Sequence, residues 1–250
     1  PETPVHPSES VKGEIEFDHV SFAYPEAGEN VLTDISFKAK KGQTIAVIGS
    51  TGSGKSTLIN LIPRYYDVTK GSVKVDGVDV RDMTQKELRD KLGYVPQKGV
   101  LFSGTIDSNI RYGKPEITDA QVKEAAEVAQ ATEFIDTKPE KYKSPVSQGG
   151  TNVSGGQKQR LSIARAIAKD PEIFIFDDSF SALDFKTDSQ LRKALKEYTK
   201  DATTVIVAQR ISTILGADQI IVLDDGHMAG IGTHKELMAN CEVYQQIARS

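Results

Sequence analysis

The sequence predicts an α/β fold: a phosphate-loop core, an antiparallel β layer on the N-terminal side and an inserted α-helical subdomain. Three observations predict it. The apolar run 45–48 leads directly into a glycine-rich loop at residues 49–56. Segments that alternate polar and apolar residues flank this loop, as half-buried strands do. A long stretch with helical spacing and capping signals then separates the loop from three later apolar runs.

The glycine-rich loop reads G-x-x-x-x-G-K-S, a pattern that binds nucleotide phosphates when a strand precedes it and a helix follows. Glycines let consecutive backbone N–H groups converge on the phosphates, while Lys55 neutralises the β/γ charge and Ser56 suits Mg²⁺. A Gly/Ser-rich turn that matches by chance is the alternative, which the strand and helix signals disfavour. The expected phosphate-binding residues of this NTPase core are Gly49, Ser50, Thr51, Gly52, Ser53, Gly54, Lys55, Ser56 and Thr57.

Elements in the first third of the chain predict the β layer. Residues 13–22 alternate for much of their length, and residues 31–39 and 73–80 indicate two further strands. Gly/Asp turns at 40–42 and 76–77 interrupt them. We therefore expect an antiparallel layer around the phosphate-loop core.

Capping signals predict the later helices. Thr118 with Gln121 opens a helix over 118–131, and Ser154 with Gln157 opens a second that stops at Asp170-Pro171. Thr233 with Glu236 opens a C-terminal helix. The short apolar runs 173–176, 205–208 and 220–223 fit buried parallel or mixed strands.

Composition places the chain among ordinary globular proteins. It has 250 residues, 38% hydrophobic and 26% charged, and a net charge of −4 that argues against nucleic-acid binding. No apolar run approaches the ~18 residues of a membrane span. A single cysteine, Cys241, excludes an internal disulfide and a cysteine zinc site. Residues 1–12 begin Pro-rich without an apolar h-region, which predicts a linker rather than a signal peptide.

The run 173–176 ends in two carboxylates, Asp177 and Asp178. In phosphate-loop proteins, the first carboxylate at such a strand end holds Mg²⁺. Four apolar residues followed by Asp-Asp also occur at ordinary strand ends. The upstream phosphate loop favours the metal role for Asp177.

Residues 152–160 contain Ser154-Gly155-Gly156-Gln157 and resemble the signature sequence of ATP-binding cassette (ABC) proteins, usually written L-S-G-G-Q. Ser154 and the N–H groups that follow it at a helix start would form a second anion-binding site. Taken without the family, the segment is simply a capped helix N-terminus. The resemblance covers residues 13–250, so it implies an ABC nucleotide-binding domain with a helical subdomain over about 97–168.

The resemblance assigns further roles. Tyr24 would stack on adenine, with a core aromatic as the alternative, and Gln97 would reach Mg²⁺ and the attacking water. Residues 181–184 resemble the loop that communicates across the cassette dimer. Residues 101–106 and 109–113 resemble exporter-type cassettes of the multidrug kind, with an importer cassette as a close rival. The implied metal ligands are Ser56, Gln97 and Asp177.

The chain departs from the family at the catalytic groups. Asp178 stands where active cassettes carry a glutamate, and a carboxylate withdrawn by ~1.5 Å loses attack geometry, which can cost ~100-fold. Gln209 replaces the switch histidine and cannot carry its charge or shuttle a proton. Residues 148–150 replace an acidic residue followed by Arg-Gly. The departures at Asp178 and Gln209 predict a site that binds Mg-ATP and hydrolyses it weakly, whereas the smaller departure at 148–150 falls on a loop that the family assigns to coupling with membrane helices.

The resemblance therefore predicts the ATPase domain of a heterodimeric ABC exporter. Its signature would serve a second, catalytically intact ABC nucleotide-binding domain, and transmembrane domains would complete the transporter. The domain itself would be soluble, lie at the cytoplasmic face of the cell membrane and bind no nucleic acid. The alternative is a soluble or regulatory ABC ATPase that is not coupled to transport.

Overall fold

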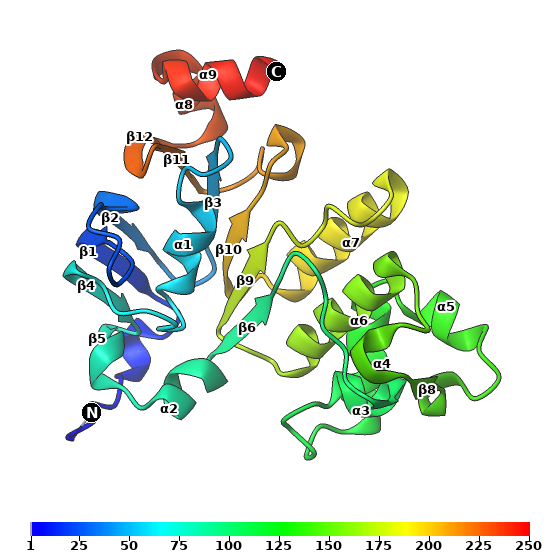
Figure 1. Cartoon of the computed structure of the whole chain (residues 1–250). Coiled ribbons are helices and arrows are strands. Elements are labelled where there is room, and N and C mark those ends of the chain that lie inside the picture. Colours follow the sequence, from blue (N-terminus) through cyan, green and yellow to red (C-terminus); the bar gives the residue numbers. More distant parts are fainter. Residues whose placement is uncertain (1) are drawn as a thin grey trace. The chain divides into compact units, whose positions relative to one another are not determined.

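The computed structural model describes residues 2–250 and divides the chain into two compact units (Figure 1). Unit 1 comprises Pro1–Leu92 and Asp201–Ser250, and unit 2 comprises Gly93–Lys200. Pro1 of the predicted linker lies outside the described residues. Within the rest of that segment, the Val5 N–H donates to Asp82 O at 2.7 Å, and His6 contacts Glu87.

Unit 1 contains the predicted antiparallel layer, a four-stranded sheet ordered β2-β1-β4-β5. Ile15 pairs with Ala39 on one side and with Val75 on the other. Phe17 and Phe37 stack with ring centroids 4.6 Å apart on the buried face. The strands are β1 (Ile15–Phe22), β2 (Leu32–Ala39), β4 (Lys70–Val75) and β5 (Val78–Asp79).

A second sheet of unit 1 is built around β3 (Thr44–Gly49). The strands β10 (Thr203–Val207) and β11 (Gln219–Asp224) flank β3 and run parallel to it. The edge strand β12 (His227–Gly232) is antiparallel to β11. All four residues of Ile45–Ile48 are fully buried, as a central parallel strand requires. The two predicted apolar strands are therefore confirmed, and the phosphate loop begins at the carboxyl end of a central strand.

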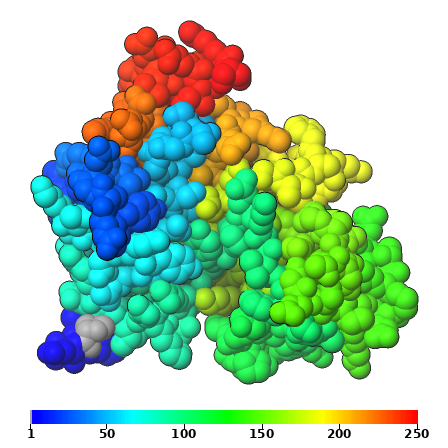
Figure 2. Space-filling model, in the orientation of Figure 1, coloured from blue at the N-terminus to red at the C-terminus, as the bar shows by residue number. Residues whose placement is uncertain are grey.

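Helices α8 (His234–Asn240) and α9 (Glu242–Arg249) close unit 1 and form the red C-terminal segment in Figures 1 and 2. The predicted capping box of Thr233 and Glu236 is present. Tyr244 is fully buried, and its hydroxyl lies 2.6 Å from His234 Nδ1, so this histidine has a structural role. The remaining helices of unit 1 are α1 (Lys55–Asn60), α2 (Gln85–Asp90) and the short turns η1 (Glu9–Val11), η2 (Val80–Asp82) and η5 (Ile211–Thr213).

Unit 2 is mainly helical, and α6 (Gly155–Ala168) is its central helix. The buried side of α6 packs against α3 and α4. The predicted capping boxes at Thr118 and Ser154 are present, and α6 ends two residues before Asp170. Its other helices and turns are α3 (Ile106–Ile110), α4 (Asp119–Val128), α5 (Thr132–Asp136), α7 (Phe185–Tyr198), η3 (Lys141–Lys143) and η4 (Gln148–Gly150).

Four strands accompany these helices. β6 (Leu92–Val95) and β9 (Ile173–Asp177) are neighbours, and β7 (Gly104–Thr105) pairs with β8 (Pro145–Val146). The strand predicted at 173–176 is confirmed, and it ends at Asp177. In residues 2–250, no helix is both long enough and apolar enough to span a bilayer.

Candidate functional site

The phosphate loop connects β3 to α1 and is shaped by glycines. Gly52 and Gly54 have φ angles of +80° and +105°, a region that glycine adopts without steric cost. A Cβ at Gly54 would lie 2.8 Å from Leu32 Cδ2 and 3.3 Å from Val31 O. A Cβ at Gly49 would lie 2.5 Å from both Ser53 Oγ and Leu223 O. Glycine is therefore required at both ends of the loop by close packing.

The donors of the loop suit an anion. The first backbone bond of α1 runs from Leu58 N–H to Gly54 O at 2.9 Å, so the N–H groups of the first turn have no acceptor within the helix. The Lys55 ammonium folds over the loop and donates to Gly49 O and Ser50 O. Residues 49–57 contain hydroxyl, amide and ammonium groups and no carboxylate. This donor set fits a nucleotide phosphate.

Tyr24 is held beside this loop. Its hydroxyl lies 2.8 Å from Thr57 Oγ1, and its ring packs edge-on against Phe22 and Tyr66 at 4.8 and 5.1 Å. The ring is half-buried rather than enclosed in the core. The contacts fix Tyr24 next to α1, and stacking on adenine stays a prediction.

Gln209 follows β10 and is exposed. The strands β10 and β3 are parallel with Val207 opposite Val47, and Ala208 N–H donates to Val47 O at 3.3 Å. The carboxyl ends of parallel neighbours lie at the same sheet edge. Gln209 therefore follows its strand at the edge where the phosphate loop begins.

Unit 2 brings Gln97 and the two carboxylates together. Asp177 is the last residue of β9, and Asp178 has a φ of +51°, so the chain turns sharply there. Gln97 Nε2 donates to Asp178 Oδ2 at 3.2 Å, across 81 residues of sequence. The Tyr94 hydroxyl donates to Asp177 Oδ2 at 3.5 Å. Tyr94 was not singled out from the sequence, where it is an ordinary strand aromatic.

Residues of the predicted signature form the start of α6. Ser154 Oγ accepts from Gln157 N–H at 3.1 Å, and Gln157 Oε1 accepts from Ser154 N–H at 3.3 Å. Ser154 and Gly155 are exposed, and a Cβ at Gly155 would meet nothing within 4 Å. The start of this 14-residue helix is therefore open to a ligand.

Two charged side chains near α6, Asp184 and Arg160, have pKa values that their surroundings lower. Asp184 caps α7 through Thr187 N–H at 2.8 Å, and this hydrogen bond lowers the pKa of its carboxyl. Burial lowers the pKa of the Arg160 guanidinium, although Asp184 opposes that shift. Arg160 packs over the Phe134 ring at 4.7 Å and donates to Gln130 O at 3.0 Å.

The ligands predicted for a metal ion are mixed oxygen donors. Among residues 2–250, no three His, Cys, Asp or Glu side chains cluster in a way that could hold a metal by themselves. The predicted ligands Ser56, Gln97 and Asp177 offer hydroxyl, amide and carboxylate oxygens, a chemistry that suits Mg²⁺ together with phosphate oxygens.

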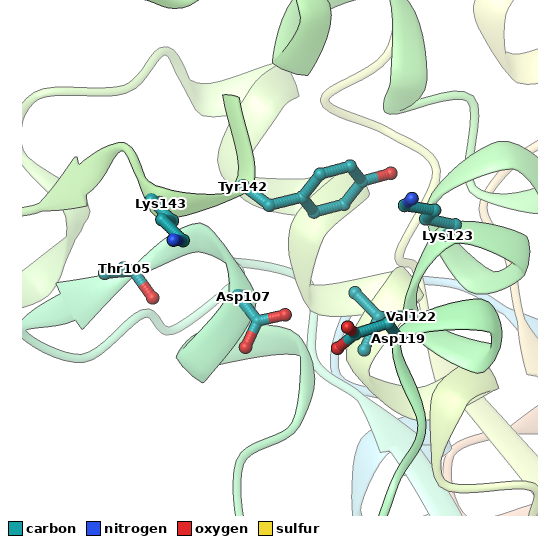
Figure 3. Close-up of a pocket in the computed structure, with 7 residues that line it drawn as sticks. All are labelled: Thr105, Asp107, Asp119, Val122, Lys123, Tyr142 and Lys143. Atoms are coloured by element: carbon teal, nitrogen blue, oxygen red, sulfur yellow. The ribbon is translucent and has the colours of Figure 1, made fainter. Parts of the chain in front are cut away.

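A separate cavity of about 280 Å³ lies in unit 2 between α3, α4 and η3 (Figure 3). In Figure 3 the Tyr142 hydroxyl points toward Lys123, while Asp107 and Asp119 lie below the Tyr142 ring in this view. Burial raises the pKa of Tyr142. Arg111 pairs with both of these carboxylates. None of the predicted site residues lines this cavity: its lining is Thr105, Asp107, Asp119, Val122, Lys123, Tyr142 and Lys143.

The fold agrees with comparisons to known proteins. The family model described as ABC transporter matches residues 32–181. The chain belongs to the ABC transporter family. Its fold is the ABC cassette, with mixed α/β sheets and a helical part, and family members bind ATP, generally with Mg²⁺.

Individual relatives are also similar. An uncharacterised ABC transporter ATP-binding protein of Mycobacterium tuberculosis is 47% identical over 253 residues, covering all of this chain and 43% of the relative. A putative multidrug export ATP-binding/permease protein of Staphylococcus aureus is 46% identical over 96% of this chain and 42% of its own length.

A solved structure, that of a bacterial Atm1-family ABC exporter with ATP bound, matches with a TM-score of 0.93 and 37% identity. The match covers 99% of this chain and 43% of the exporter chain. This cassette therefore spans less than half the length of the relatives it matches. Such relatives include exporters, which agrees with the exporter-like segment at residues 101–113.

Proposed function

We propose that this cassette is the ATP-binding domain of a heterodimeric ABC exporter, with a binding-competent but hydrolytically weak site of its own. One observation carries the proposal. Every element expected to bind the nucleotide is present, whereas the two main departures from the family lie at catalytic positions, Asp178 and Gln209. Altered catalytic groups beside unaltered binding groups are what a site retained for binding would have.

Residues of unit 1 would bind the phosphates and the base of the nucleotide. The N–H groups around Gly52 and Gly54, together with the Lys55 ammonium, would bind the phosphates, and Tyr24 would support the base. Ser56 with Gln97 and Asp177 would hold Mg²⁺, which neutralises charge on the terminal phosphates when bound. Stacking discriminates poorly between purines, so Tyr24 supports a purine nucleotide in general.

Weak ATP hydrolysis is expected because the side chains of Asp178 and Gln209 are poorly suited to catalysis. Asp178 is one methylene shorter than glutamate, and one of its oxygens already accepts from Gln97 at 3.2 Å. A carboxylate misplaced by about 1 Å can lose about 100-fold in rate. Gln209 donates hydrogen bonds but is uncharged, so it stabilises developing phosphate charge less than an imidazolium would.

The open start of α6 supports a partner cassette. In this family the resemblance implies composite sites, in which the signature of one cassette completes the site of the other. Ser154 and the glycines after it would therefore serve a partner that supplies the glutamate and histidine missing here. Transmembrane domains would couple this pair to export, with the cassettes at the cytoplasmic face of the membrane and no nucleic acid involved.

Two rivals make different predictions. A regulatory ABC ATPase shares the altered catalytic pair but does not need an intact signature. An importer cassette differs in its membrane partner, and the segment 101–113 together with the exporter relatives favours export. Co-purification with a membrane subunit from native membranes distinguishes the exporter from a soluble ATPase.

The decisive variant is made in the assembled transporter. Asp178→Glu with Gln209→His should raise steady-state ATP turnover, while Lys55→Ala should remove ATP binding at this site as the matched control. Unchanged turnover in the double variant, with ATP binding intact, would contradict the proposal of a weak site.

A further inference from the structure

Gln159 is a buried polar residue in the second turn of α6, and the ATP-binding role gives it no function. Its side chain is 1% exposed, among neighbours on the helix that are mostly apolar. A buried amide is costly unless its polar atoms are hydrogen-bonded. The location of its partners therefore shows what this residue does.

Both partners lie next to predicted catalytic residues. Gln159 Nε2 donates to Pro96 O at 3.0 Å and to Ser179 O at 2.8 Å. Pro96 directly precedes Gln97, and Ser179 directly follows Asp178. The NH₂ group of Gln159 thus donates one hydrogen bond to each of the two segments that carry Gln97 and Asp178.

A second tie joins the same two segments. Ser179 is fully buried, and its Oγ donates to Val95 O at 2.6 Å. The backbone next to Gln97 and the backbone next to Asp178 are therefore held together in two ways, by the Gln159 side chain from α6 and by the Ser179 side chain that follows β9. The Gln97 side chain itself is exposed, so its own 3.2 Å bond to Asp178 competes with water.

Gly99 allows α6 to approach this closely. A Cβ there would lie 2.9 Å from Lys158 O, 3.1 Å from Gln159 Oε1 and 3.1 Å from Ser162 Cβ. Any other residue at Gly99 would push the segment after Gln97 away from α6 and lengthen the bonds of Gln159.

We propose that Gln159 is a positioning residue that holds Gln97 beside Asp178 and links both to the helix that begins with the signature. A displacement of the α6 N-terminus is then transmitted through one side chain to the residues expected to face the terminal phosphate. The functional consequence rests on the proposed ATP site, whereas the mechanical link concerns this chain alone.

Hydrogen exchange of the purified, nucleotide-free chain tests the link. Gln159→Met keeps the length of the side chain and removes both donors. Loss of two bonds should raise amide exchange in residues 95–99 and 178–181 about ten- to thirtyfold. Gln159→Glu keeps the shape but places an acceptor-only carboxylate against the carbonyl oxygens of Pro96 and Ser179, so it should loosen the same segments at least as much. Ile163→Val is the matched control, because Ile163 is buried in the same helix and makes none of these hydrogen bonds.

The outcomes separate this proposal from its rivals. Faster exchange confined to those two segments supports the positioning role. Unchanged exchange in the folded variants overturns it, as does a uniform increase along α6 like that of the control, which indicates packing alone. Mg-ATP binding by the wild-type chain is measured separately, so a failure of the proposed function is recognised independently.

Discussion

Gly54→Ala tests whether the phosphate loop depends on close packing as well as on glycine torsions. Gly54 has a φ of +105°, and a Cβ there would lie 2.8 Å from Leu32 Cδ2. Leu32 is fully buried, so its side chain has little room to move. Gly52→Ala is the matched control, because Gly52 has a φ of +80° but nothing lies within 4 Å of its Cβ position.

The two variants share one cost and differ in another. A left-handed torsion costs a non-glycine residue about 1–2 kcal/mol, and both variants incur it. Overpacking adds about 1–3 kcal/mol, and only Gly54→Ala incurs that. The expected losses in free energy of unfolding are therefore about 1–2 kcal/mol for Gly52→Ala and about 2–5 kcal/mol for Gly54→Ala.

Urea titrations followed by circular dichroism give the free energies of unfolding, and calorimetric titration gives Mg-ATP affinity. Gly54→Ala should also weaken ATP binding more than the control, because Gly54 caps the helix that begins at Lys55. Equal destabilisation of the two variants would show that contact with Leu32 is unimportant, and the packing argument would then be wrong.

Two further predictions concern unit 1. Tyr24→Ala should weaken Mg-ATP binding by about 10- to 100-fold through lost stacking, whereas Tyr24→Phe, which loses only the bond to Thr57, should bind nearly normally in the same titration. Equal losses would refute stacking. The hydrogen bond that the His19 ring donates to the Asp34 carboxylate raises the pKa of His19 above its ordinary 6.5, so this pair stabilises the fold below that pH and its contribution is lost as the pH rises through the raised pKa. An NMR titration should show the His19 pKa falling in Asp34→Asn, and an unchanged pKa would contradict the pairing.

Local signals in the sequence predict the elements whose physics is local. The capping boxes at Thr118, Ser154 and Thr233 and the apolar strand 173–176 were all predictable, because caps and buried strands depend on neighbouring residues. The strand β12 was not predicted. It contains two glycines and alternates only between exposed and half-buried positions, which leaves little hydrophobic signal.

In the candidate site, too, only the parts that are local in sequence could be predicted from it. The phosphate loop is contiguous, so its residues could be identified directly. The contact between Gln97 and Asp178 joins residues 81 apart, and only the family resemblance suggested that both belong to one site. Gln159 carried no signal, because its role depends on two backbone carbonyls that tertiary structure brings to it.

Steady-state ATP hydrolysis by the purified chain tests the central proposal most directly. The wild type is compared with Asp178→Glu/Gln209→His after both are shown to bind Mg-ATP. We predict binding without appreciable turnover in the wild type and turnover in the double variant. Brisk hydrolysis by the wild type would contradict this proposal, because Asp178 and Gln209 would then suffice for catalysis.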